Sequence, residues 1–380
     1  MASDRNTDAE LRARRIMADF AVRTGLSPHG LQRRYLWTDA FALCNYLTLL
    51  RRTGETQYRD LAFLLIDRVH HVLGRHREDD TRTGWISGLS DEEGERHPTA
   101  GGLRIGKELN ERSATEPYDP RLEWDRDGQY YHYLVRWMHA LARAAEVLEE
   151  PTFHAWAVEL AGAAHSGFTF RPAPGAAPRM YWKTSIDLNR PLVPSQGAHD
   201  PLDGFVTLRA LGSERLRREL DELGRMCHPS AWATDDPLGV GGLLTDAWWV
   251  AQLSRSGDAE GQRLEPLLPQ LLEASLSSLQ ALDATQAFRL PLEDRLAFRE
   301  LGLAIGLRAL EALLDSGVAA ATGLDAGALR WLERYEPIAD AITQIWSSPD
   351  ARALGTWRDH EDINDVMLAT ALAPDEYIRV

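Results

Sequence analysis

Acidic residues recur in five short segments of the sequence, four of which also contain an aromatic residue: WTDAF, EWDRDGQYYHY, HDPLDGF, ATDDPLGVGG and TWRDHEDINDV. Each segment stands at the start of an apolar run with helical spacing, so its acids lie at a predicted helix N-terminus. One aspartate can cap such an end, because its carboxylate accepts hydrogen bonds from free N–H groups and complements the helix dipole. Three pairs of acids exceed that need: Asp125 with Asp127, Asp200 with Asp203, and Asp235 with Asp236.

Carboxylates beside aromatic rings are typical of a sugar site. The rings stack on the C–H faces of a sugar, and the carboxylates accept hydrogen bonds from its hydroxyl groups. Two carboxyl groups in different environments can also act as a general acid and a general base. The candidate catalytic acids are Asp39, Asp125, Asp203 and Asp246.

The alternative for these acids is a structural role. Capping accounts for many of the aspartates at helix starts. Asp246 lies inside the apolar run LLTDAWWV, where a carboxylate needs either a partner or a chemical task. A structural Asp246 would bond a neighbouring pair of helices.

Tryptophan and histidine supply the candidate substrate-binding residues. The chain contains 12 tryptophans, and several lie near the acidic segments. A pair of histidines at helix starts can exchange protons at a sugar carbon, whereas a single histidine can simply bond a helix cap. The candidate substrate-binding residues are Trp37, Trp85, Trp124, His132, Lys183, His199 and His360.

The elements that must position these residues are helices in pairs. No segment alternates as a strand would, and apolar residues recur at helical spacing instead. The first helix of each pair is apolar nearly all round and is expected to be buried, whereas the second has one apolar face. The expected pairs are 36–50 with 58–73, 130–148 with 152–165, 202–211 with 214–226, 239–253 with 264–279, and 296–314 with 328–346.

The two ends of the chain supply a sixth pair, formed by helices over 8–22 and 363–373. Six inner and six outer helices of this kind resemble the six-hairpin (α/α)6 toroid superfamily, and the resemblance covers the whole chain. Members of that superfamily include glycoside hydrolases, unsaturated glucuronyl hydrolases and N-acylglucosamine 2-epimerase-like enzymes. The resemblance implies a single all-α domain over residues 1–380, with the N-terminal helix packed beside the C-terminal inner helix.

Two connections between expected helices are much longer than the others. They run over residues 76–123 and 166–199, and connections of this length in a compact domain are usually functional or disordered. In a ring of hairpins, both lie at the end that carries the inner-helix starts. We therefore expect them to form a lid over the mouth of the ring.

The stretch KTSIDLNRPLVPSQGAHDPLDGF, residues 183–205, belongs to this lid. Three prolines stiffen it, and Lys183 is one of only two lysines among 42 basic residues. We expect the stretch to line the central cavity, with Lys183, His199 and Asp203 pointing into it. The alternative is a rigid packing loop whose aspartates cap the third inner helix.

These observations favour a carbohydrate-active enzyme, in the first place a glycoside hydrolase that uses two aspartates. One alternative is a sugar epimerase or isomerase that uses paired histidines, and another is a non-catalytic binding protein on the same fold. A third is a terpene cyclase-like enzyme, because Glu361, Asp362 and Asp365 resemble an acid-rich Mg²⁺–diphosphate motif.

Composition limits the partners. The net charge of -15 repels a phosphate backbone, so a nucleic-acid partner is not expected. No run of 18 apolar residues predicts a membrane span, and no secretory segment precedes the first helix, so we expect a cytoplasmic protein. The two cysteines form no metal-ligand pattern. We expect a small-molecule substrate, no metal and no cofactor.

Overall fold

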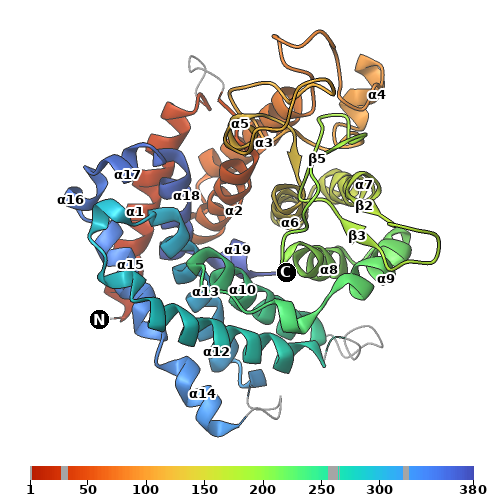
Figure 1. Cartoon of the computed structure of the whole chain (residues 1–380). Helices are drawn as coiled ribbons and strands as arrows, with labels where there is room; N and C mark the ends of the chain where they lie inside the picture. Colours follow the sequence, from red (N-terminus) through yellow and green to blue (C-terminus); the bar gives the residue numbers. More distant parts are fainter. Residues whose placement is uncertain (1, 27–32, 256–263, 265, 320–324) are drawn as a thin grey trace. The chain divides into compact units, whose positions relative to one another are not determined.

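The computed structural model describes residues 2–26, 33–255, 264, 266–319 and 325–380 (Figure 1). They divide into two compact units. The first unit comprises residues 21–227, and the second comprises residues 1–20 together with 228–380. Helices dominate both units, so the predicted all-α class is confirmed within the described residues.

The first unit contains three helix pairs. In each pair the two helices contact each other, and the first helices of the pairs also contact one another in chain order. The pairs are α2 (Leu36–Thr53) with α3 (Thr56–Leu73), α6 (Tyr131–Val147) with α7 (Pro151–Phe168), and α8 (Asp200–Leu211) with α9 (Arg217–Met226). A 3-10 turn, η1 (Glu214–Leu216), precedes α9.

The second unit continues the same pattern. Its first helices are α10 (Pro237–Ser254), α13 (Ala297–Asp315) and α18 (Glu361–Leu372), and α13 contacts both of the others. Their partners are α12 (Leu267–Thr285) and α15 (Glu336–Trp346). The helix α1 (Ala2–Arg23) belongs to this unit as far as Phe20, and its predicted place beside the last inner helix stays a prediction.

Short elements complete the second unit. They are α14 (Ala326–Glu333), α16 (Pro349–Arg352), α17 (Gly355–Arg358), α19 (Asp375–Ile378), η2 (Pro229–Ala231), η3 (Ala287–Arg289) and η4 (Leu292–Asp294). The single helix predicted over 328–346 is wrong, because it is broken into α14 and α15. Pro337 lies in the first turn of α15 and has no N–H to continue the earlier helix.

Burial follows the predicted division into first and second helices. In α2 the residues from Leu36 to Leu49 are buried without interruption, whereas α3 buries one stripe that includes Tyr58, Leu65 and Val69. A helix that is apolar on all sides is stable only when other elements surround it. The predicted pairing of a buried helix with a one-sided helix is therefore confirmed here. The closed ring and the single domain over residues 1–380 stay predictions.

Short strands, which the sequence did not predict, lie after the first long connection of the first unit and within the second. The strands β1 (Gln129–Tyr130), β4 (Lys183–Thr184) and β5 (Pro191–Val193) form one antiparallel sheet in that order. A hairpin of β2 (Thr169–Phe170) and β3 (Arg179–Met180) forms a second sheet. Strands of two or three residues are too short to show alternation in a sequence.

The same connections include two short helices, α4 (Asp91–Arg96) and α5 (Pro120–Asp125). The connections also bond each other, because β1 follows the first connection and β4 belongs to the second. In the described part of the chain, no helix is both long enough and apolar enough to cross a membrane.

Helices α10 and α13 approach each other backbone to backbone. A Cβ placed on Gly241 would lie 2.0 Å from the carbonyl oxygen of Gly302, and a Cβ on Gly306 would lie 2.4 Å from the oxygen of Gly241. Only glycine permits this approach. The contact fixes the distance between the two first helices of the second unit.

We expect Gly241→Ala to destabilise the protein by about 1–3 kcal/mol, because the added methyl group must push the two backbones apart. The matched control is Gly162→Ala in α7, where nothing lies within 4 Å of the added Cβ. There the higher helix propensity of alanine should stabilise the protein by about 0.5–1 kcal/mol. Thermal unfolding of both variants tests the difference, and an equal shift in Tm would contradict the close approach.

Candidate functional site

The starts of α2, α6 and α8 carry the polar and aromatic residues that we assign to a candidate site in the first unit. The first long connection runs along the start of α2, where the amide of Leu36 donates to the oxygen of Ile105 at 3.0 Å. The strand β1 leads directly into α6. The second connection ends at His199, the residue before α8.

His132 of α6 and Asp200 of α8 form the centre of the candidate site. Nδ1 of His132 lies 3.7 Å from Oδ1 of Asp200, slightly beyond hydrogen-bond distance. The His132 side chain is 22% exposed, and that of Asp200 is 7% exposed. Among the described residues, neither Nδ1 of His132 nor Oδ2 of Asp200 has a hydrogen-bond partner. Both groups therefore have an atom available for a proton or a ligand.

Asp203 lies one turn after Asp200 on α8, and it faces a guanidinium group. Nη2 of Arg136 donates to Oδ2 of Asp203 at 3.4 Å, and both side chains are buried. The contact joins α6 to α8 and balances the charge of the Asp203 carboxylate. Close packing supports it, because a Cβ on Gly204 would lie 2.3 Å from the hydroxyl of Tyr131.

Aromatic rings surround His132. They are Trp37, Tyr130, Tyr133 and Trp182, whose ring centroids lie 5.9, 5.3, 4.8 and 6.4 Å from that of His132. Trp182 is stacked on the imidazole, with an interplanar angle of 23°. The hydroxyl groups of Tyr35 and Tyr133 are hydrogen-bonded at 2.7 Å. The candidate site thus combines two carboxyl groups and an imidazole with the aromatic surfaces that a sugar ring favours.

Burial acts in opposite directions on the two central groups. Together with the nearby Asp203, whose effect is smaller, it raises the pKa of Asp200 to about 8. Burial is the main cause that lowers the pKa of His132 to about 4. Asp203 raises this pKa by a smaller amount, and Arg136 lowers it. The neutral forms are favoured in both cases, because a charge is costly away from water. At neutral pH the pair therefore has a protonated carboxyl group beside an unprotonated imidazole.

Asp39 bonds the start of its own helix, and its predicted catalytic role stays a prediction. Its Oδ1 pairs with Nη1 of Arg34 at 3.1 Å, and its Oδ2 accepts the amide of Tyr35 at 3.1 Å. The side chain is buried. Both oxygens are used to hold the start of α2.

Lys183 bonds residues at the end of the first connection, and its predicted role in substrate binding stays a prediction. The side chain is fully buried, and its ammonium group donates to two oxygens of Glu123, the backbone O at 2.6 Å and Oε1 at 3.1 Å. It also donates to the backbone oxygen of Arg126 at 2.8 Å. These three acceptors match its three N–H groups. Burial lowers the pKa of Lys183, and Glu123 opposes that effect.

Trp85 is packed between other residues of the first unit. Its ring is buried against His71 and the guanidinium of Arg75. A Cβ on Gly94 of α4 would lie 2.2 Å from the ring, so the helix is in direct contact with it. The predicted role of Trp85 in substrate binding stays a prediction.

The other predicted residues of the first unit lie in different surroundings. Trp37 and His132 are in the cluster described above. His199 immediately precedes α8, and its backbone oxygen accepts the amide of Asp203 at 2.9 Å. Asp125 and Trp124 are exposed on α5. Roles for Asp125 and His199 in catalysis or binding stay predictions.

Asp246 and His360 belong to the second unit. Asp246 is fully buried within α10, and His360 precedes α18 with its ring 5.5 Å from that of Phe298. Their predicted roles stay predictions. The acid-rich segment at the start of α18 is weaker as a metal motif, because Oδ1 of Asp365 is bound to Arg352 at 2.6 Å. Among the described residues, no group of three histidine, cysteine or acidic side chains is arranged to hold a metal ion.

Sequence reasoning missed five residues of the cluster as candidates: Asp200, Arg136, Tyr130, Tyr133 and Trp182. A signal existed for Asp200, because it forms an i, i+3 acid pair with Asp203 at a helix start. Arg136 follows His132 by four residues and lies on the same helix face, where a basic residue inside an apolar run needs an acidic partner. Trp182 precedes Lys183 in the second connection.

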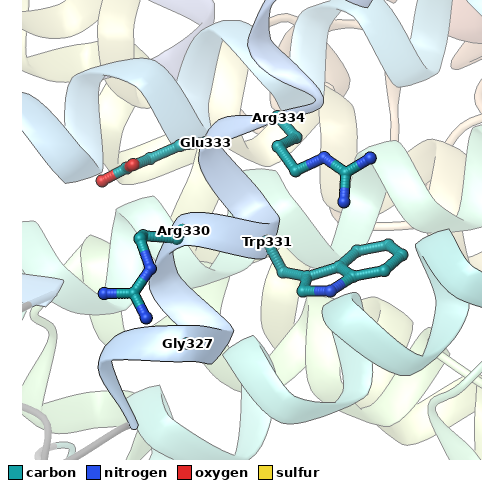
Figure 2. A pocket seen from close by; sticks show the side chains of 5 residues that line it. All are labelled: Gly327, Arg330, Trp331, Glu333 and Arg334. Carbon is teal, nitrogen blue, oxygen red and sulfur yellow. The ribbon is translucent and has the colours of Figure 1, made fainter.

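An open pocket lies elsewhere, on α14 in the second unit. Figure 2 shows Trp331 and Arg334 on one side of the helix, with Arg330 and Glu333 on the other. The guanidinium of Arg334 lies 4.8 Å from the Trp331 ring. The described lining contains one carboxylate and no histidine. It offers no acid–base pair, so the cluster around His132 is the stronger candidate.

Searches with known proteins return structural similarity only. No family model matches the chain, and no curated protein does. A sugar epimerase from a ruminal bacterium has 12% identity and a TM-score of 0.48, over 92% of this chain and 90% of the other. An unsaturated glucuronyl hydrolase from Bacillus sp. GL1 has 16% identity and a TM-score of 0.33, over 74% and 84%. Both are of the kinds that the sequence resemblance names, and at these identities no residue role carries over.

The opposed pKa shifts predict a pH-dependent stability. The folded state binds the Asp200 proton more tightly than the unfolded state does. The contribution of this proton to the free energy of unfolding is therefore full below about pH 4 and is lost as the pH rises through about 8. The His132 contribution has the opposite sign, because it is full above about pH 6.5 and is lost as the pH falls through about 4. Between about pH 6.5 and 8 only the Asp200 effect remains.

We therefore expect Asp200→Asn to gain stability relative to the wild type between pH 6.5 and 8, by up to about 1.4 kcal/mol per pH unit. Denaturant unfolding at a series of pH values measures the difference. Asp125→Asn is the control, because that side chain is exposed. Its free energy of unfolding should differ from that of the wild type by the same amount at every pH in this range. A flat difference for Asp200→Asn would contradict the raised pKa.

The two lysines give a matched pair of variants. Lys183→Met removes one partner of a buried ion pair and should cost about 3–5 kcal/mol. Lys107→Met removes a partly exposed ammonium that lies over the ring of Tyr35 at 5.5 Å, and it should cost at most about 1 kcal/mol. Thermal unfolding tests the ranking. Similar Tm values for the two variants would show that the Lys183 contacts are not stabilising.

Proposed function

We propose that this protein is a carbohydrate-active enzyme, a glycoside hydrolase whose two carboxyl groups are Asp200 and Asp203. One observation supports the proposal above the others. Two acids on one turn of α8 lie in different environments, since Asp200 is beside a neutral imidazole and Asp203 is beside a guanidinium. Carboxyl groups that differ in this way can divide the roles of acid and base.

In this mechanism Asp200 is the general acid. Its raised pKa keeps it protonated at neutral pH, so it can donate its proton to the glycosidic oxygen as the C–O bond breaks. Asp203 is the carboxylate that assists attack at the anomeric carbon, either by removing a proton from water or by attacking directly. After the leaving group has taken its proton, Asp200 recovers one from water, either from the water that hydrolyses a glycosyl–enzyme intermediate or from bulk solvent.

The aromatic rings give the cluster its suitability for a sugar. Trp37, Tyr133 and Trp182 place apolar faces around His132. A sugar ring has apolar C–H faces and a polar rim, so it can stack on these rings while its hydroxyl groups reach the acids. A purely apolar ligand would leave the buried carboxyl groups without hydrogen-bond partners.

A second candidate function is a sugar epimerase or isomerase. The observation that favours it is the acid–base pair itself, because unprotonated His132 can remove a proton from a sugar carbon and protonated Asp200 can supply one. His199, which precedes Asp200, is the second histidine that this mechanism would use. Incorporation of solvent deuterium into an unhydrolysed sugar distinguishes this function from hydrolysis.

A screen of aryl glycosides and unsaturated uronides tests the hydrolase. With a substrate in hand, Asp200→Asn and Asp203→Asn should each lower kcat by about 10²–10⁴-fold without a large fall in Tm. Asp125→Asn should retain wild-type turnover. Loss of the Asp200 proton should also reduce the rate above about pH 8.

Two results would contradict the proposal. Uniform inactivity of a folded protein across the screen would favour a non-catalytic binding protein. Full activity of Asp200→Asn and Asp203→Asn would place both acids in the scaffold.

A further inference from the structure

The short helix α5 presents a tryptophan to solvent. Trp124 is 52% exposed, although a large indole is normally highly buried. The next residue, Asp125, is exposed as well, and Arg126 after it pairs with Glu116. An exposed aromatic surface with charged neighbours suits a ligand that has a small apolar face and a polar rim.

Buried charges hold α5 in place. Glu123, the neighbour of Trp124, is buried, and its two carboxylate oxygens bind different cations. Its Oε1 accepts from Lys183 at 3.1 Å, and its Oε2 accepts from Arg112 at 2.9 Å. The carboxylate of Asp119 caps the helix by accepting the amide of Arg121 at 2.8 Å. The backbone that carries Trp124 is therefore fixed, while its indole remains free to contact a ligand.

A continuous series of rings leads from Trp124 to the candidate site. The rings of Trp124 and Trp182 have centroids 5.0 Å apart at an interplanar angle of 77°. Trp182 in turn lies 5.8 Å from Tyr130 and is stacked on His132 at 6.4 Å. Trp182 thus contacts both the exposed indole and the imidazole beside Asp200.

We propose that Trp124 and Trp182 form a stacking subsite for a second sugar unit, so that the substrate is a disaccharide or a longer glycan. This inference rests on the proposed carbohydrate function of the cluster around His132. One sugar unit binds at His132, Asp200 and Asp203, and the next unit stacks on the indole surface of Trp182 and Trp124. The Lys183–Glu123 contact is the anchor that keeps α5 in position for this binding.

Binding of glycans to a non-hydrolysing variant tests the subsite. Calorimetric titration of Asp200→Asn uses gluco-, manno-, galacto-, xylo- and chito-saccharides of one, two and three units as probes. For the series that binds, we expect affinity to rise from one unit to two. Adding Trp124→Ala should weaken binding of the two-unit and three-unit probes by about tenfold and leave the one-unit probe unchanged.

Two further variants keep the result interpretable. Trp124→Phe retains an aromatic face and should keep most of the affinity. Trp331→Ala removes another exposed indole, 37% exposed, from α14 in the second unit, and should match its parent. Any of three results would overturn the subsite. The affinity could still rise with glycan length in Trp124→Ala, Trp331→Ala could lose as much affinity as Trp124→Ala, or every probe could fail to bind.

The outcomes separate this inference from the proposed hydrolase. Hydrolysis of aryl monoglycosides without any gain from a second sugar unit would overturn the subsite and leave the hydrolase standing. Length-dependent binding through Trp124, without turnover by the wild type, would support the subsite and count against the hydrolase. If Trp124→Ala instead changes the native mass and leaves glycan affinity unchanged, the indole docks a second copy and the subsite is overturned.

Discussion

The ion pair between Lys183 and Glu123 is the interaction on which the candidate site depends. It joins the two long connections of the first unit at a point where both side chains are buried. If one of the two residues were missing, the buried charge of the other would cost several kcal/mol. The two connections are therefore held together only while both charges are present. Their immediate neighbours in sequence are Trp124 and Trp182, whose rings contact each other. A contact that takes no part in chemistry thus sets the positions of the rings beside His132.

Desolvation then decides which groups near those rings bear charge. Asp200 lies in the first turn of α8, where the helix dipole favours an anion. Burial nevertheless raises its pKa, and the carboxylate of Asp203 one turn away adds to the effect. Arg136 stands beside Asp203, so the negative charge on α8 is best accommodated there. The same burial keeps His132 neutral. At neutral pH the cluster can therefore hold a transferable proton on Asp200, and no buried charge in it is left without a partner.

Much of the fold is predictable because helix pairing depends on local periodicity. The buried run of α2 and the one-sided stripe of α3 are visible in the sequence as apolar spacing. The strands β1 and β4 are not, because two residues have no period, and their pairing joins Gln129 to Thr184 across the chain. Lys183 was singled out for its rarity, but its three acceptors come from residues 57–60 positions away. Only tertiary structure shows that its donors are satisfied.

The acids at helix starts show how far a surplus of carboxylates can identify a site. Asp236 caps α10 by accepting the amide of Gly239, which is the ordinary role. Asp39 also lies near a helix start, but its charge is met by Arg34 from its own segment, only five residues away. Asp203 instead meets Arg136 from a different helix, and α8 has no side-chain cap. An acid whose partner is local stabilises one helix end, whereas acids that face another helix bring charge to a shared interior. That difference separates Asp203 from Asp39, and it becomes visible only when the fold brings α6 and α8 together.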